Sequence, residues 1–547
     1  MKKKLLITFG ILALIGIAGG IWLSYNWYRL PSIIRNIKNP VAENQPTTWQ
    51  DGPTARTDDK PNIVVIMADD LGFNEVSTYG GGLANGQLKT PNIDQLAADG
   101  VLCTNGYSAT AVCSPSRAAL LTGRFATRFG YEFTPTAKGY GKVIDYLAKD
   151  RAMPPIYREE IDNQLPSVSD MGLPPSEITI PEMLKPQGYH SVHVGKWHLG
   201  GSKDFIPTNH GFDESLWIES GSLFLPENHP DVVNAKLTDI MDKFVFANLP
   251  YAVQFNDSAP FKPDGHLTDY LTNEAVKVIE KNKNQPFFLY LAYWAVHRPL
   301  QALQSDYDKL DYIDNHVERV QAAMVMTVDR GVGKIRQALT ENGIDDNTII
   351  IFTSDNGAPN TYGLPNVNKP YRGWKVTFFE GGVHIPFIVS YPKSIPSGQR
   401  YDGRVSNVDI FSTLGTLTGV TLPTDRKMDG ENILPYLTGE QAGEPARPLF
   451  CKSGTYSFLI KDGWKLQVDE WQDKKWLFDL NTDPTEQHNL VATNPQKLAE
   501  LSQLRQELMA EQQAEPIWEG ALTSPVLIDE PIRKEVTEED EYIYWTN

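Results

Sequence analysis

The sequence predicts an α/β fold: a doubly wound, mostly parallel sheet with helices on both faces, followed by a small C-terminal α+β subdomain with an antiparallel sheet. Three observations support this prediction. Continuous apolar runs recur along the chain, as in strands that are buried on both faces. Helical patterns separate these runs. After about residue 440 the runs become short and cluster around a tight turn, ahead of one clear helix.

The expected elements follow in chain order. Apolar runs predict strands within residues 61–70, 191–200, 286–297, 347–357 and 385–392, and helices are expected within 90–100, 179–188 and 316–340. In the C-terminal part, residues 457–468 form a hairpin pattern around Asp462-Gly463. A further strand within 474–484 and a helix within 494–513 complete the subdomain.

The chain has 547 residues, which is enough for two or three domains and a large core. We divide it into residues 1–30 (signal peptide or membrane anchor), 31–60 (linker or surface wrap), 61–440 (main α/β domain) and 441–547 (C-terminal subdomain). The net charge of −18 argues against a nucleic acid partner. An anionic substrate would instead need a local cluster of cations.

The N-terminus has an export pattern, because three lysines precede an apolar run over residues 5–23. Ala18 and Gly20 offer a cleavage site for a signal peptide. The run is also long enough to attach the chain to a membrane, and Trp27 and Tyr28 then suit an interfacial aromatic belt. Both alternatives predict an exported protein that is periplasmic, anchored in the inner membrane or secreted.

Polar side chains follow four of the predicted strands. They are Asp69 and Asp70, Lys196 and His198, His297, and Asp355 and Asn356. If these strands are parallel neighbours, their carboxyl ends meet at one edge of the sheet, where ligands of open α/β sheets bind. The acidic pairs offer only oxygen ligands, which suit Ca²⁺ or Mg²⁺ and not zinc. The alternative for each pair is an ordinary polar loop start.

Five cationic or titratable side chains would complete such a site. They are Arg117, Lys196, His198, His297 and Lys375. Each one alone fits a solvated surface position. Together, beside a divalent metal, they would form a pocket for a tetrahedral dianion.

Cys113 precedes a pattern that predicts a helix from about Pro115 to Thr122, with Ser114 as the N-cap and Gly123 as the stop. The helix dipole then favours an anion near Cys113. The residues alone leave three alternatives for this cysteine: a disulfide with Cys103, a buried free thiol or a thiolate nucleophile. The roles of Cys103 and Cys451 stay open.

The segment Cys113-Ser114-Pro115-Ser116-Arg117, continued by Leu-Thr-Gly-Arg at 121–124, resembles the C-x-P-S-R signature of the type I, formylglycine-dependent sulfatases. Further segments agree in order: NIVVIMADDLG, GYHSVHVGKWHLG, AVHRPL, TSDNG and RGWKVTFFEGGVHIPFIVSYP. The resemblance covers roughly residues 61–495 and is nearest to the arylsulfatase B-like and bacterial polysaccharide sulfatase branch. It implies an alkaline-phosphatase-like fold and a sulfatase catalytic domain over residues 61–440.

The resemblance also implies a cofactor set and residue roles. Cys113 would be converted to formylglycine (3-oxoalanine) by a maturation enzyme, and Ca²⁺, or Mg²⁺ in its place, would be held by Asp69, Asp70, Asp355, Asn356 and the modified Cys113. Lys196, Lys375 and His297 would bind the sulfate. Arg117 would support the hydrated aldehyde, His198 would act on it, and His297 would face the leaving oxygen.

The implied activity is hydrolysis of a sulfuric ester on a sulfated oligo- or polysaccharide, either a sulfated galactan such as carrageenan or a glycan of the GalNAc-4-sulfate type. Alternatives are an arylsulfatase of broad specificity, a phosphomonoester or phosphonate hydrolase of the same superfamily, and an inactive protein that binds sulfated glycans. Six aromatic residues are candidate platforms for sugar rings, with core packing as the alternative for each: Tyr131, Phe133, Trp217, Phe224, Trp294 and Trp374.

Overall fold

The computed structural model describes residues 26–56, 58–151, 153–237, 240–513, 515–531 and 540–547, together with residues 19, 20 and 22. A nine-stranded sheet dominates it, with the order β12-β2-β11-β10-β1-β8-β4-β5-β7. The strands are β1 (Asn62–Ala68), β2 (Val101–Tyr107), β4 (His190–Lys196), β5 (Glu214–Ile218), β7 (Gln254–Phe255), β8 (Phe287–Ala292), β10 (Thr348–Ser354), β11 (His384–Ser390) and β12 (Gln399–Ser406). This sheet confirms the predicted α/β class.

The centre of the sheet is parallel, because β10, β1, β8 and β4 pair side by side in the same direction. β11 is fully buried in the sheet but runs antiparallel to β10, whereas its apolar run had indicated a parallel strand. The physical reason is simple. An unbroken apolar run reports burial on both faces of a sheet and says nothing about chain direction.

Helices cover both faces, and β1 shows how the sequence achieves this. Val64 and Ile66 point into one core, and Ile63 and Val65 point into the other, because successive side chains of a strand alternate. The first core is shared with α4 (Pro91–Ala98), α10 (Leu267–Asn282) and α12 (His316–Glu341), and the second with α5 (Cys113–Thr122), α8 (Ile180–Leu184) and α14 (Asp409–Leu417).

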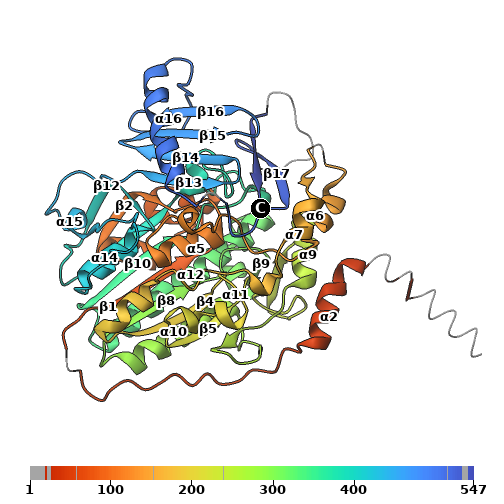
Figure 1. Ribbon diagram of the computed structural model, residues 1–547. Coiled ribbons are helices and arrows are strands. Elements are labelled where there is room, and N and C mark those ends of the chain that lie inside the picture. The colour runs from red at the N-terminus through yellow and green to blue at the C-terminus, as the bar shows by residue number, and fades with distance from the viewer. Residues whose placement is uncertain are drawn as a thin grey trace, which may run out of the picture.

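The C-terminal part packs a second, antiparallel sheet against the main domain (top of Figure 1). Its strands are β13 (Leu449–Ser453), β14 (Tyr456–Lys461), β15 (Trp464–Asp469) and β16 (Lys474–Asp479), and α16 (Pro495–Ala510) lies beside them. Asp462 and Gly463 form the predicted turn with φ values of 52° and 79°. This geometry is that of a type I′ hairpin turn.

Two further small sheets were not anticipated. β17 (Leu522–Leu527) pairs with β18 (Tyr542–Thr546) and with β3 (Ile156–Tyr157), and β6 (Val232–Ala235) pairs with β9 (Leu300–Leu303). The remaining helices are α2 (Leu30–Lys38), α3 (Leu83–Gly86), α6 (Tyr140–Ala148), α7 (Glu159–Gln164), α9 (Ile240–Asn248), α11 (Gln304–Tyr307), α13 (Glu380–Val383) and α15 (Leu434–Leu437).

The predicted linker or wrap over residues 31–60 contains α2, a helix that the sequence interpretation did not include. Trp49 in the same segment is buried, and its indole N–H donates to Glu274 Oε2 at 2.7 Å. The apolar run over residues 5–23 lies almost entirely outside the described residues. Within the described part of the chain, no helix has the length and apolar character needed to cross a bilayer.

Candidate active site

Four parallel strands end at one edge of the sheet, and the polar residues that follow them meet there as expected. Asp69 follows β1 and Asp355 follows β10, and the pairing of Ala68 with Ser354 places these two carboxylates side by side. Lys196 is the last residue of β4. His297 lies in the loop after β8, the strand between β1 and β4.

α5 supplies Cys113, and this helix begins earlier than predicted. It starts at Cys113 itself with Val112 as the N-cap, so the expected start near Pro115 with Ser114 as the cap was wrong. The Ser114 hydroxyl is used elsewhere: it donates to the His198 carbonyl at 2.5 Å and accepts from the Tyr131 hydroxyl at 2.8 Å. These bonds tie the start of the helix to the loop after β4.

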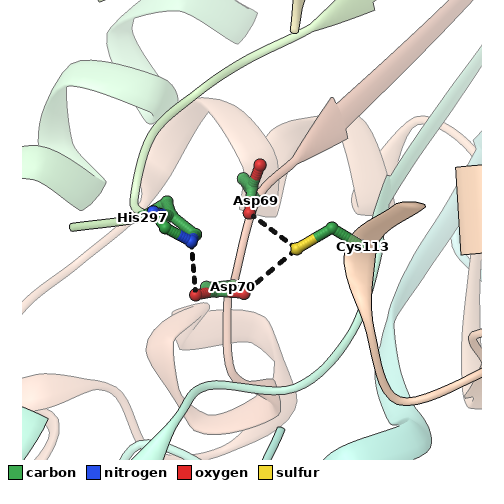
Figure 2. A group of neighbouring side chains, drawn as sticks. All are labelled: Asp69, Asp70, Cys113 and His297. Atoms are coloured by element: carbon green, nitrogen blue, oxygen red, sulfur yellow. Dashed lines mark hydrogen bonds and ion pairs between the residues drawn. The ribbon is translucent and has the colours of Figure 1, made fainter. Parts of the chain in front are cut away.

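Cys113 lies in a cluster with Asp69, Asp70 and His297, and its sulfur faces the two carboxylates (Figure 2). Its Sγ is 3.5 Å from Asp69 Oδ1 and 3.9 Å from Asp70 Oδ1, and Lys375 Nζ lies 3.0 Å from it. Burial raises the pKa of the Cys113 thiol, and the nearby carboxylates raise it further, which argues against a thiolate nucleophile. Cys103, Cys113 and Cys451 are all free thiols, so the disulfide with Cys103 is not formed.

Arg117 lies one helical turn after Cys113, fully buried between two carboxylates. Its guanidinium donates to Asp355 Oδ2 at 2.7 Å, to Asp69 Oδ2 at 3.0 Å and to the Lys196 carbonyl at 3.1 Å. Burial alone would lower the pKa of Arg117, but the charges around it, Asp355 first among them, outweigh burial and raise it. The side chain therefore positions the two acids, and the described contacts do not include Cys113.

Two lysines reach the same carboxylates from other segments. Lys196 Nζ is 2.5 Å from Asp69 Oδ2, and Lys375 Nζ is 2.6 Å from Asp70 Oδ1. Burial opposes the charge of Lys375, yet Asp70 and the other negative groups hold its pKa above the usual range. The Lys375 ammonium is therefore charged, and a bound anion would meet the side-chain nitrogens of two lysines at this edge.

The donor set fits a hard divalent cation. Asn356 Nδ2 donates to Asp70 Oδ1 at 2.7 Å, whereas the buried Asn356 Oδ1 has no hydrogen-bond partner among the described residues. A buried polar oxygen without a partner is costly, and a metal ion would satisfy it. Asp69, Asp70 and Asp355 supply carboxylate oxygens next to it, in keeping with Ca²⁺ or Mg²⁺.

The two histidines are held in neutral form. Burial lowers the pKa of His297, and Lys375 and Lys196 lower it further. Its Nδ1 donates to the Arg298 carbonyl at 2.7 Å, so Nε2, 3.6 Å from Asp70 Oδ2, is the nitrogen free to exchange a proton. Burial also lowers the pKa of His198, followed by the charges of Lys196 and Arg117.

Three residues at this edge have a strained backbone conformation. Asp70 and His198 both have φ of 59°, and Val376, next to Lys375, has φ of 66°. A left-handed conformation costs a non-glycine residue about 1–3 kcal/mol and is most unfavourable for a β-branched one. Three such residues around one cluster indicate that the orientation of these side chains is obtained at a cost in local stability.

The cluster lies in a cavity of about 1410 Å³. Of the six aromatic platform candidates, Trp217 and Trp294 line this cavity, and Lys196 Nζ lies 4.5 Å from the ring centre of Trp294. The other four pack in the core outside it: Tyr131, Phe133, Phe224 and Trp374. The sequence could not separate these groups, because both kinds are nearly inaccessible.

Comparison with known proteins decides the family. The sulfatase family model matches residues 61–420, about two thirds of the chain. The chain belongs to the sulfatase family. It is a sulfuric ester hydrolase, and the resemblance drawn from the C-x-P-S-R segment is confirmed. The C-terminal model of N-sulphoglucosamine sulphohydrolase matches residues 373–514, which include Lys375 and the four-stranded sheet.

Named relatives of this sulfatase differ in the esters their names denote. The N-acetylgalactosamine-6-sulfatase of Mus musculus is 33% identical over 80% of this chain and 78% of its own length. The steryl-sulfatase of Rattus norvegicus is 30% identical over 80% and 81%. A crystal structure of Ps i-CgsB in complex with k-i-k-neocarrahexaose superimposes with a TM-score of 0.70 at 30% identity, covering 84% of this chain and 94% of that one.

Sequence reasoning missed several residues around the site of this sulfatase. The Tyr362 hydroxyl lies 3.5 Å from Asp70 Oδ2 and donates to the Val296 carbonyl at 3.2 Å. Ser524, Trp545 and Asn547, from β17, β18 and the last residue, line the cavity. In the sequence, Tyr362 lies between the second acidic pair and the lysine segment, and this position is the only feature that could have indicated it. No sequence feature indicated the C-terminal residues.

The C-terminal sheet of the sulfatase also holds the segment that carries Lys375. The backbone N–H of Phe378 donates to the Tyr456 hydroxyl at 3.0 Å, and that of Glu380 donates to Glu486 Oε2 at 2.6 Å. Lys465 Nζ lies 2.7 Å from Glu380 and 2.9 Å from Glu486, with all three side chains buried. The second sheet therefore fixes the backbone that presents Lys375 to the cavity.

Proposed function

We propose that this sulfatase removes sulfate from a sulfated carbohydrate, with Cys113 converted to formylglycine as the reacting residue. One observation carries the proposal: Cys113 lies at the start of a buried helix and lines the large cavity, within reach of two carboxylates and the ammonium of Lys375. An unmodified thiol with a raised pKa would be a poor nucleophile in this position. A hydrated aldehyde supplies two hydroxyl groups on one carbon, one for attack on sulfur and one whose deprotonation releases sulfate.

Asp69, Asp70, Asp355 and Asn356 are the residues that would hold Ca²⁺, with Mg²⁺ as the alternative. When bound, the ion would lower the pKa of a coordinated hydroxyl group and stabilise negative charge on the sulfuryl oxygens. The partnerless Asn356 Oδ1 supports this assignment. Arg117 would hold Asp69 and Asp355 in place whether or not the ion is present.

The remaining roles follow from charge and proton position. Lys196 and Lys375 would neutralise the sulfuryl oxygens, because both side chains line the cavity beside Cys113. Neutral His198 would accept the proton from the second hydroxyl of the hydrate. His297 would protonate the leaving oxygen from Nε2, and the negative charge of a bound sulfate ester would favour the second proton that this role requires.

The named relatives and the cavity support a carbohydrate with galactose configuration as the substrate, either a sulfated galactan or a sulfated N-acetylgalactosamine glycan. One relative is named for N-acetylgalactosamine 6-sulfate and another is solved with a neocarrahexaose. A cavity of about 1410 Å³ is larger than the 300–1,000 Å³ that small ligands usually occupy. Trp217 and Trp294, which line the cavity and are almost fully covered, would form part of the wall around the substrate.

Mass spectrometry of the peptide that contains residue 113 tests the modification. We expect that peptide to be lighter than the encoded one by the mass of H₂S less one oxygen atom, since –CH₂SH becomes –CHO. The protein has to be produced in a host with the maturation enzyme. An active preparation in which every peptide carries an intact cysteine would contradict the proposal.

The same preparation distinguishes the competing activities. We expect hydrolysis of 4-nitrophenyl sulfate to exceed that of 4-nitrophenyl phosphate by about 100-fold or more. The reason is that the charge of the phosphate ester matches the charges of the site less well than that of the sulfate ester. Sulfate release from defined carrageenan and N-acetylgalactosamine oligosaccharides should exceed release from the aryl ester. Preference for the phosphate would indicate a phosphomonoesterase. Glycan binding without any sulfate release would indicate an inactive binding protein.

Calcium is expected to stabilise the fold independently of catalysis. A ligand present at about 100 times its dissociation constant adds about 2.7 kcal/mol to the free energy of unfolding. The melting temperature of EDTA-treated protein should therefore rise when Ca²⁺ is added, and the rise should be lost in Asn356→Ala. An equal rise in that variant would place the ion elsewhere.

A further inference from the structure

α2 presents its apolar side to solvent and its polar side to the protein, the reverse of a helix in a soluble domain. Four aliphatic side chains recur at i, i+3, i+4 and i+7, which places them on one face. They are Leu30, Ile33, Ile34 and Ile37, exposed by 36, 38, 50 and 76%. We call this group the α2 stripe. All nine residues of α2 are described, and none is buried.

The polar contacts of α2 explain this orientation. The backbone N–H of Ser32 donates to Asn248 Oδ1 at 3.1 Å, and the Arg35 guanidinium donates to the Asn248 carbonyl. Asn248 Nδ2 in turn donates to the Tyr28 carbonyl at 2.8 Å. Asn248 ends α9, so two hydrogen bonds from α2 and one to Tyr28, which lies just before it, fix which side of α2 faces the protein. The stripe is therefore held outward by specific bonds.

The surroundings of the stripe indicate what covers it. The apolar run over residues 5–23, preceded by three lysines, comes directly before it in the sequence. Trp27 lies at its N-terminal end and packs edge-on against the exposed Tyr146, at 6.0 Å between ring centroids. Arg29 and Lys38 stand exposed at the two ends of the helix. Aliphatic face, interfacial aromatics and flanking cations together are the composition of a helix that lies in a bilayer surface.

We propose that α2 is an interfacial helix whose stripe inserts into the surface of an anionic lipid bilayer. The consequence concerns the active site, because Arg35, Lys38 and residues 39–41 line the catalytic cavity. The mouth of the cavity is thereby held at the membrane surface (α2 lies at the edge of the molecule in Figure 1). With a net charge of −18 the body of the protein is repelled by anionic lipid, so this patch also sets the orientation.

The test uses the full chain with a nitroxide label, reconstituted into vesicles of phosphatidylethanolamine and phosphatidylglycerol. The three native cysteines are buried, so the label goes to an introduced one: Ile37→Cys on the stripe, or Tyr312→Cys as an exposed control on another part of the surface. We expect the ratio of collisions with oxygen to collisions with a water-soluble nickel chelate to be severalfold higher at position 37 than at position 312. This depth measurement is independent of catalysis.

A second variant places charged residues on the α2 stripe and tests whether its apolar character is needed for insertion. In Ile33→Cys with Ile34→Lys and Ile37→Lys, the label should become as accessible to nickel as the control, and hydrolysis of soluble 4-nitrophenyl sulfate should stay unchanged. None of the three replaced isoleucines lines the cavity. An aqueous label at position 37 in vesicles would overturn the proposal. So would dipolar broadening between labels on neighbouring copies, because the stripe would then be an interface between two chains.

Discussion

Replacement of Cys113 by serine or alanine is expected to abolish sulfate release and to leave the fold intact. Loss of a covalent nucleophile from a hydrolase lowers kcat by roughly 10³-fold or more. Serine could form one sulfate ester but lacks the second hydroxyl on the same carbon, so it could not release the sulfate by returning to an aldehyde. Alanine could form no ester at all. Turnover is measured as sulfate released at saturating substrate.

Two measurements keep this prediction specific. Side chain 113 is small and lies in a polar cluster, so the free energy of unfolding should fall by no more than about 1 kcal/mol in Cys113→Ser. Cys451→Ser is the matched control, because Cys451 is also a buried free thiol but does not line the cavity. It should keep its activity. A serine variant at position 113 with a wild-type rate would refute the formylglycine mechanism.

Lys465→Met is expected to destabilise the protein by about 3–5 kcal/mol, the usual result of removing one partner from a buried ion pair. Lys465 is fully buried and is the cation shared by Glu380 and Glu486. Burial raises the pKa of Glu486 to about 7, and Lys465 counteracts that rise. Without the lysine, two carboxylates would be left facing each other in the interior. The midpoint of urea unfolding measures the change.

The control is Lys461→Met on the preceding strand. Lys461 is partly exposed and pairs with the exposed Asp462, so its loss should change stability by no more than about 0.5 kcal/mol. In Lys465→Met we also expect weaker sulfate binding, because Glu486 accepts the backbone N–H that anchors the segment of Lys375. Unfolding midpoints that coincide in the two variants would show that the buried network contributes nothing.

The sequence predicted much of the candidate site because its residues directly follow buried strands. A strand that is covered on both faces has to be apolar, so the change to Asp69-Asp70 or Asp355-Asn356 marks where the strand leaves the core. Parallel pairing then brings these ends together, as the neighbouring order of β10, β1, β8 and β4 shows. The predicted start of α5 was wrong, because Ser114 fits the sequence pattern of an N-cap but forms a tertiary hydrogen bond instead.

The part of the cavity wall that the C-terminal residues form could not be predicted. β17 contains Pro525, and a proline within an apolar run argues against a strand that pairs on both sides. β17 nevertheless lies between β18 and β3. Residues 156–157 join this sheet from a distant part of the chain. Pairings over such distances depend on which edges are left free once the main sheet has formed.

By itself the sequence determined the α/β class, the segments that resemble the sulfatase family and the residues that meet at the sheet edge, because burial and strand ends leave a local pattern. Three features were decided only by the tertiary structure. They are the antiparallel direction of β11, the hydrogen bond by which Glu486 fixes the segment of Lys375, and the exposure of the apolar face of α2. Each of these depends on which distant surface a segment meets. A local pattern records how much of a segment is covered, and it does not record what covers it.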